Sequence, residues 1–560
     1  MLNRLLIPLL AFATLFASCT AEKYDIVITN GIVYDGSGDF PDEADIGIRG
    51  DKIVTIGTIH NTSGAKKVIN AGGKAVTPGF INMLSWGAGS LLNDGRSMSG
   101  IKQGVTLELF GEGSSVGPLS EEMQRQRWGD NPSDYLWQTL GEGLQHLEDN
   151  GISTNVGSFV GATTLRIHQI GYNDREPTEE ELATMKQLTD EAMREGAMGL
   201  GTSLIYAPAF YAKTDELIEL SKVVGEYDGM YISHMRSEGN RLVESVEELI
   251  TIGREAGVHA EIHHLKAAGR QNWDKLDQVI EKVEEARSSG QPVTANMYTY
   301  DAAATSLAAI FPPWTQDGGH SAWIERLKDP ETREQIIEEI KTPSDGWENF
   351  YLMAGGGNGI ILVGLRSDEL QKYVGMTLSE VAAERGDKDE VRTAVDLTVE
   401  DNNRIGAIYY LMSEENVQRQ IQLPWMSFGS DGGTFAAEGD ILNRQMHPRA
   451  WGNFARLLGK YVREEKLISL EEAIYRLTGL PATNLKLNNR GLLKEGYYAD
   501  IVIFDPETIE DHATFENPHQ YATGVEHVFV NGIQVLDNGE HTGESPGRFV
   551  KGPGYYAAQN

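Results

Sequence analysis

Apolar and polar positions alternate with a period of two near both ends of the chain. Between residues 24 and 79, short apolar runs are separated by turns, and an Asn-Gly pair at residues 30–31 predicts a β-hairpin. Residues 500–504 and 528–533 carry the same pattern. Because an isolated terminal hairpin is only marginally stable, we expect the two ends to pair in one small β domain.

The middle of the chain combines short apolar runs with helical periodicity. A capping-box pattern at residues 177–181 begins one helix, which Gly196 ends, and a second helix with one apolar face ends at Gly257. This strand–helix alternation favours parallel strands, and a (β/α)8 TIM barrel is the simplest closed arrangement at this length. An open doubly wound sheet is the rival, but no Gly-x-Gly-x-x-Gly follows a first strand.

The first residues predict an export signal. Arg4 precedes an apolar stretch, residues 5–16, that is too short to span a membrane. The following Phe16-Ala17-Ser18-Cys19 resembles a bacterial lipobox, and Cys19, the only cysteine, would be lipidated. Thr20, rather than Asp, favours an outer-membrane anchor facing the periplasm. The alternative is an ordinary signal peptide with a cysteine near its cleavage site.

Composition restricts the partners of the chain. The sequence has 560 residues, enough for two to four domains, and carries 48 basic and 82 acidic side chains, a net charge of −34. Such a charge repels nucleic acid and anionic lipid. No later stretch is apolar enough to span a bilayer, so we expect membrane contact only through a lipid anchor.

Two histidines end neighbouring apolar runs. His234 and His264 are 30 residues apart, the length of one strand–helix–strand unit, so their imidazoles can converge on one ion at the carboxyl end of a barrel. The alternative is that both are ordinary core or loop residues. Asp431, between an apolar strand and a glycine-rich turn, is suited to shuttle a proton, or equally to cap the next helix.

A series of phrases resembles the D-aminoacylase branch (N-acyl-D-amino-acid deacylases) of the amidohydrolase superfamily. The phrases are Val76-Thr77-Pro78-Gly79-Phe80-Ile81, Gly104-Val105-Thr106, Ser233-His234-Met235-Arg236-Ser237-Glu238, His263-His264-Leu265-Lys266-Ala267-Ala268-Gly269, Gly429-Ser430-Asp431-Gly432, His447-Pro448-Arg449, Glu471-Glu472-Ala473-Ile474, Thr478-Gly479-Leu480-Pro481 and Tyr498-Ala499-Asp500-Ile501-Val502. They follow one another in the family's order over nearly all of the mature chain. The resemblance implies a TIM barrel inserted into a small β-sandwich domain made from both chain ends. We therefore expect an anchor at residues 1–19, the β domain at 24–79 and 488–545, and the barrel at 80–487.

The metal site departs from the family pattern. Where the family has His-x-His after the first barrel strand, this chain has Leu84 and Trp86, which cannot ligate a metal. A bridging cysteine is also missing, and Glu112 stands next to its position. Relatives with one metal bind it through Glu, His and His. The resemblance thus implies one zinc ion per chain held by Glu112, His234 and His264, with Glu108 on the same strand as the competing ligand.

The resemblance also implies a reaction. We expect hydrolysis of a linear amide bond in an N-acyl-D-amino acid, with a zinc-activated water and Asp431 as general base and then general acid. Lys266, Tyr298 and Arg449 match the positions that hold the substrate carboxylate, although Lys266 and Arg449 could instead form structural ion pairs. A Gly-His pair of the family reads Gly-Ala at residues 161–162, which weakens the substrate assignment.

Other functions stay open at this point. A dipeptidase or another amide hydrolase of the superfamily would use the same groups, with an N-acylated peptide as its small-molecule substrate. A non-catalytic binding protein on a degenerate barrel would explain the lost ligands, but not the retention of two histidines and an aspartate. Residues 314–358 match no family phrase and form either a lid over the site or a surface insertion.

Overall fold

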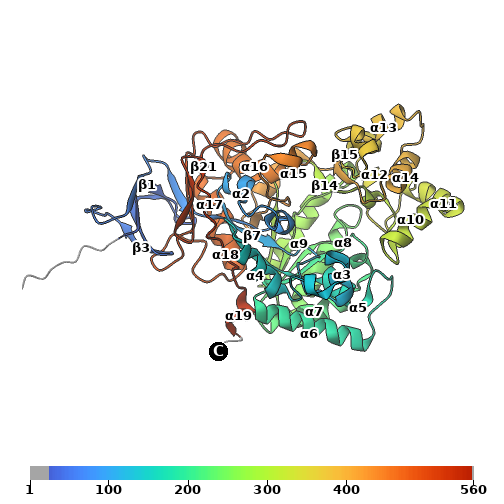
Figure 1. The fold of residues 1–560 in the computed structure, drawn as a ribbon, viewed down its shortest axis with the longest axis horizontal. Helices are drawn as coiled ribbons and strands as arrows, with labels where there is room; N and C mark the ends of the chain where they lie inside the picture. The colour runs from blue at the N-terminus through green and yellow to red at the C-terminus, as the bar shows by residue number, and fades with distance from the viewer. Residues whose placement is uncertain (1–23, 558–560) are drawn as a thin grey trace, which may run out of the picture.

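A closed barrel of parallel strands forms the centre of the computed structural model, which describes residues 24–557 (Figure 1). The order β6-β7-β8 continues as β9-β10-β11-β12-β13-β17, because only Phe159 separates β8 from β9. A parallel bridge between Ser85 and Gly432 joins the last strand to the first. The (β/α)8 fold is confirmed. Its strands are β6 (Phe80–Asn82), β7 (Val105–Phe110), β8 (Asn155–Ser158), β9 (Val160–Gly161), β10 (Gly199–Ser203), β11 (Met230–His234), β12 (His259–Ile262), β13 (Val293–Met297) and β17 (Met426–Phe428).

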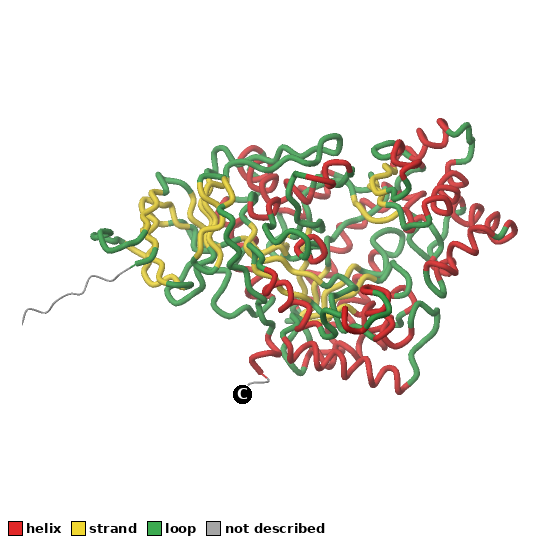
Figure 2. The backbone as a smooth tube through the Cα atoms, viewed as in Figure 1, coloured by secondary structure: helices red, strands yellow, loops and turns green. Residues whose placement is uncertain are grey.

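Helices follow the barrel strands and cover their outer faces (Figures 1 and 2). Two of them agree with the sequence predictions: α6 has the capping box of Thr178 with Glu181 and ends at Gly196, and α8 ends at Gly257. The helices are α1 (Ala88–Leu91), α2 (Met98–Ile101), α3 (Glu121–Trp128), α4 (Leu140–Asn150), α5 (Ala162–Ile170), α6 (Glu179–Glu195), α7 (Thr214–Gly225), α8 (Leu242–Ala256), α9 (Leu276–Ser288), α15 (Glu414–Ile421), α16 (Arg449–Arg456), α17 (Leu470–Leu477), α18 (Gly479–Asn484) and α19 (Pro553–Ala557).

Strands from both chain ends form one sheet, drawn at the left of Figure 1. The two ends meet where β18 runs antiparallel to β5. One hydrophobic cluster contains side chains from both ends, among them Ile48 and Phe529. The strands are β1 (Ile26–Val33), β2 (Asp42–Arg49), β3 (Lys52–Gly57), β4 (Lys67–Asn70), β5 (Ala75–Pro78), β18 (Ile501–Phe504), β19 (Val525–Val530), β20 (Ile533–Asp537) and β21 (Glu540–His541).

The hairpin predicted at Asn30-Gly31 is wrong. Both halves of this stretch belong to β1 and pair with the same neighbour, β2, with a register shift between Ile28 and Gly31. The pair is therefore a β-bulge, with Asn30 at φ 53°. A Cβ at Gly31 would lie 2.4 Å from Val76, so the sheet requires glycine here. The same two residue types do form the turn between β19 and β20.

An insertion between β13 and β17 extends well beyond residues 314–358, the stretch that the sequence marked as a lid or surface insertion. It contains a three-stranded antiparallel sheet and a group of helices, at the upper right of Figure 1. Residues 314–358 lie within it and include the helices α10, α11 and α12. Its elements are β14 (Ala303–Ser306), β15 (Ile360–Gly364), β16 (Gly406–Tyr409), α10 (His320–Lys328), α11 (Pro330–Lys341), α12 (Phe350–Met353), α13 (Leu378–Glu384) and α14 (Glu390–Asp401).

The predicted export signal and Cys19 lie outside the described residues. Within residues 24–557, no helix is both long enough and apolar enough to cross a membrane.

Candidate active site

Three ligand-type side chains meet at the carboxyl end of the barrel. Glu112 follows β7, His234 ends β11, and His264 follows β12. One carboxylate oxygen of Glu112 lies 3.0 Å from His234 Nδ1 and 3.0 Å from His264 Nε2. All three side chains are buried, and their ligand atoms lie within 4.8 Å of one another. The structure thus brings the three ligands predicted from the sequence to one point.

Glu108, the competing ligand, points to other partners. Its carboxylate accepts hydrogen bonds from Asn82 at 3.0 Å and from Ser97 at 3.2 Å. Burial raises the pKa of Glu108 above its usual value, against the effect of these hydrogen bonds. No contact joins Glu108 to either histidine of the group. Its carboxylate connects β6 and β7 beneath the site, so Glu112 is the carboxylate that the geometry favours.

A second carboxylate, Glu238, stands behind the histidines. Its Oε1 lies 3.0 Å from His264 Nδ1 and accepts from Lys266 Nζ at 2.6 Å. Burial alone would lower the pKa of His264, but the carboxylates of Glu238 and Glu112 outweigh burial and raise it to about 9. The position of Glu238, four residues after His234, was the available sequence signal for this role.

Lys266 has an ionic partner within the protein. It lines the pocket described below, but its buried ammonium is already paired with Glu238. The structural ion pair, which the sequence left open as an alternative, is the arrangement observed.

Asp431 lies beside this group, directly after β17. Its Oδ1 accepts from the indole nitrogen of Trp86 at 3.1 Å, and its Oδ2 forms an ion pair with Arg449 Nη1 at 2.7 Å. Trp86 occupies one of the positions where the family has a ligand histidine, and sequence reasoning found no role for it beyond the lost metal ligand. Both oxygens of the candidate base are thus held from fixed directions.

Two of the reactive residues have unusual backbone conformations. His264 has a φ of 33° and Asp431 a φ of 48°, in the left-handed region that residues other than glycine rarely adopt. Hydrogen bonds hold both in place: His264 N donates to Asn296 Oδ1 at 2.9 Å, and Asp431 N donates to Leu84 O at 2.9 Å. Such strain, about 1–3 kcal/mol per residue, is concentrated at functional sites.

These residues open into one cavity of about 540 Å³. The barrel contributes the three candidate metal ligands together with Asp431 and Tyr298, and the insertion contributes most of one wall. The insertion residues in this wall are Ala303, Ala304, Thr305, Ser306, Phe350, Val363, Arg404 and Ala407. Residues 314–358 therefore take part in the pocket through Phe350. A cavity of this size accommodates a small organic substrate.

Tyr298 supports the guanidinium of Arg449. The Arg449 guanidinium lies over the Tyr298 ring, 4.7 Å from its centre. Burial raises the pKa of Tyr298 well above its usual value, so its hydroxyl keeps its proton. Arg449 Nη2 also donates to the backbone oxygen of Ala304 at 3.1 Å. The backbone of Ala304 thus supplies an acceptor for Arg449 from the insertion.

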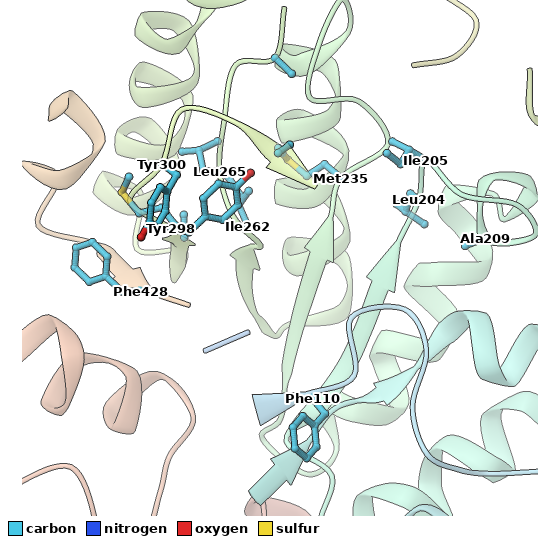
Figure 3. Close-up of a cluster of buried hydrophobic side chains, with 14 of the residues drawn as sticks. Phe110, Leu204, Ile205, Ala209, Met235, Ile262, Leu265, Tyr298, Tyr300 and Phe428 are labelled. Atoms are coloured by element: carbon cyan, nitrogen blue, oxygen red, sulfur yellow. The ribbon is translucent and has the colours of Figure 1, made fainter. Parts of the chain in front are cut away.

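Apolar side chains surround the polar centre. Figure 3 shows Phe110, Met235, Leu265 and Phe428 at or just beyond the carboxyl ends of their strands. Each is at most 4% exposed. These side chains belong to the main hydrophobic cluster of the barrel, and Met235 and Leu265 directly follow the site histidines His234 and His264 in the chain.

Comparison with known proteins agrees with this geometry. A family model described as "Amidohydrolase family" matches residues 395–536. A D-aminoacylase from Alcaligenes xylosoxydans xylosoxydans is 33% identical over 95% of this chain and 98% of its own length. An N-acyl-D-aspartate deacylase from the same organism is 33% identical, over 95% of each chain.

Solved structures give the same result. An N-acyl-D-glutamate deacylase from Bordetella bronchiseptica, complexed with zinc and a phosphonate inhibitor, superposes with a TM-score of 0.78. It shares 28% identity and covers 95% of this chain and 100% of its own. A D-aminoacylase crystal structure has a TM-score of 0.77 and 32% identity, covering 94% and 100%. The chain belongs to the D-aminoacylase family of the amidohydrolases, hydrolases of carbon–nitrogen bonds other than peptide bonds.

Proposed function

We propose that this protein hydrolyses the amide bond of N-acyl-D-amino acids, using one zinc ion held by Glu112, His234 and His264. The observation that carries the proposal is the buried Glu-His-His group, in one pocket with Asp431. The relatives that are named for D-aminoacylase and N-acyl-D-amino-acid deacylase activities support the substrate class. The solved relative with zinc and a phosphonate inhibitor supports the metal.

The residues present fit a zinc ion. Two imidazoles and a carboxylate are a common donor set of catalytic zinc sites. Ligand atoms of a tetrahedral zinc site lie about 3.3 Å apart, given bonds of about 2.0–2.1 Å. The observed separations of 3.0 Å therefore need only a small expansion. The other ring nitrogen of His234, Nε2, faces Glu238 Oε2 at 3.7 Å, so Nδ1 is the nitrogen that the ion would contact.

The side chains divide the reaction between them. A bound zinc ion supplies Lewis-acid polarisation of the amide carbonyl and lowers the pKa of the attacking water. Asp431 takes a proton from that water and returns it to the leaving nitrogen. Arg449, 2.7 Å from Asp431, is placed to hold the α-carboxylate, which is one carbon away from that nitrogen. Glu238 would accept a hydrogen bond from His264 Nδ1, which leaves Nε2 for the ion, and Lys266 holds the Glu238 carboxylate in place.

Metal content and activity together test this function. Wild type should contain about one zinc ion per chain, Glu112→Ala should lose it, and Glu108→Ala should keep it. Activity should be measured on N-acetyl-D- and N-acetyl-L-amino acids and on a dipeptide. Zinc-dependent release of acetate from the D-series supports the proposal. Cleavage of the dipeptide alone would instead favour a dipeptidase, and wild type free of metal after zinc supply would exclude the zinc mechanism.

We also propose that the mature protein is a lipoprotein of the bacterial envelope, anchored through Cys19 in the outer membrane and facing the periplasm. The lipobox-like sequence before Cys19 supports this. Wild type should incorporate labelled palmitate and fractionate with outer membranes, and Cys19→Ala should do neither. Unlabelled wild type released into the periplasm would indicate an ordinary signal peptide.

A further inference from the structure

Three cationic side chains line the active-site pocket, and two of them are already paired. Lys266 pairs with Glu238, and Arg449 pairs with Asp431. Arg404 lines the same pocket, but no carboxylate of residues 24–557 lies within ion-pairing distance of it. Its guanidinium is therefore the positive charge of the pocket that the protein itself leaves uncompensated.

Arg404 is placed for contact with a ligand. It lies in the insertion, just before β16, and its one hydrogen bond is with a neutral partner, Gln316 Oε1, at 3.3 Å. Burial lowers the pKa of Arg404 below its usual value, although part of the residue is exposed and it lines the cavity. A partly desolvated guanidinium without an anionic partner is well suited to bind a carboxylate.

The location of Arg404 separates it from the scissile bond. The α-carboxylate of an N-acyl amino acid must lie near Asp431, and Arg449 is the cation there. Arg404 contacts neither Asp431 nor the Glu-His-His group and shares its wall with Ser306 and Val363. A group that reaches Arg404 therefore lies farther along the substrate than the α-carboxylate.

We propose that Arg404 binds a second carboxylate of the substrate, so that the pocket selects N-acyl amino acids with two acidic groups. This rests on the proposed function and narrows its substrate class. The second carboxylate can belong to an acidic amino-acid side chain or to a dicarboxylic acyl group. Both sources present the same planar anion to the guanidinium, and the experiment below distinguishes the side-chain carboxylate from the acyl carboxylate.

The test compares three substrates that differ in the second carboxylate. N-acetyl-D-leucine has none, N-acetyl-D-glutamate has it on the side chain, and N-succinyl-D-leucine has it on the acyl group. Arg404→Met should lower kcat/KM for one of the two dicarboxylates by about 10- to 100-fold, mainly through KM, and change N-acetyl-D-leucine by about 2-fold at most. The affected substrate identifies the source of the carboxylate.

Two variants control this result. Arg404→Lys keeps the charge and should recover part of the loss. Arg366→Met removes an exposed arginine of the insertion that lies outside the pocket lining, and should behave as wild type on all three substrates. Equal effects of Arg404→Met on all three substrates, or no effect on either dicarboxylate, would overturn the inference while leaving the deacylase function intact.

Calorimetric titration tests the carboxylate subsite independently of catalytic activity. If wild type hydrolyses none of the three substrates, the deacylase proposal fails. The subsite is then judged by titrating the holoenzyme with D-glutamate and with succinate. Binding that Arg404→Met weakens at least about tenfold supports the carboxylate subsite. Binding that is absent, or equal in both proteins, refutes it.

Discussion

Trp86→Phe is the most informative single substitution, because it removes one hydrogen bond and little else. The indole nitrogen of Trp86 donates to Asp431 Oδ1 at 3.1 Å, and a phenyl ring keeps most of the apolar surface. A hydrogen bond to a charged group contributes about 1.5–3 kcal/mol. The Trp86 side chain is 50% exposed, so water can partly replace the donor. We therefore expect the lower end, about 1.5 kcal/mol, which is roughly a tenfold fall in kcat.

The assay must separate positioning of the base from loss of the site. Zinc content should stay at the wild-type value, since Trp86 touches none of the three ligands. KM should change by no more than about threefold, because Arg449 and the insertion wall remain. Trp273→Phe is the matched control: its indole also donates at 3.1 Å, to Leu411 O, outside the pocket lining. A kcat for Trp86→Phe within about twofold of wild type, at full zinc content, would refute a positioning role.

Two further substitutions test the contribution of buried charged groups to stability. Burial raises the pKa of Glu348 from 4.5 to about 7. The protein should therefore keep its full stability below pH 4.5, and its free energy of unfolding should fall by on the order of 3 kcal/mol as the pH rises through 7. Glu348→Gln should remove this loss. The same change of melting temperature with pH in both proteins, between pH 4.5 and 8, would contradict the prediction. Asp500→Ala leaves the buried Arg490 without its ionic partner and should lower the free energy of unfolding by about 3–5 kcal/mol. Asp51→Ala breaks the partly exposed pair of Asp51 with Arg548 and should lower it by at most about 1 kcal/mol, and equal losses would disprove the argument.

Short-range patterns predicted the barrel well. Both limits of α6 and the end of α8 follow from local capping, and the spacing of His234 and His264 follows from the length of one strand–helix–strand unit. Local patterns also mislead, since Asn30-Gly31 forms a bulge while the same pair after β19 forms a hairpin turn. What decides between them is whether a neighbouring strand can pair with both halves, which is a long-range property.

Contacts between distant segments could not be predicted. Trp86 and Asp431 are separated by 345 residues, and no local feature of either suggests the hydrogen bond between them. Arg404 lies in the insertion, whose sequence matched no family phrase, so its place in the pocket depended on the fold of about one hundred preceding residues. The role of Lys266 was left open for the same reason, because its partner Glu238 comes from a different strand end.

The charges of the pocket suggest how reaction and selection are divided. On the barrel side, Asp431 and Glu238 each face a cation, so the groups that would carry out the chemistry are held by the protein before a substrate enters. Such preorganisation avoids reorganisation during the reaction. On the insertion side, no carboxylate in the described part of the chain pairs with Arg404, and a ligand must complete its interactions. Changes in the insertion would therefore alter which acyl amino acids bind, whereas changes at the strand ends would alter the rate for all of them.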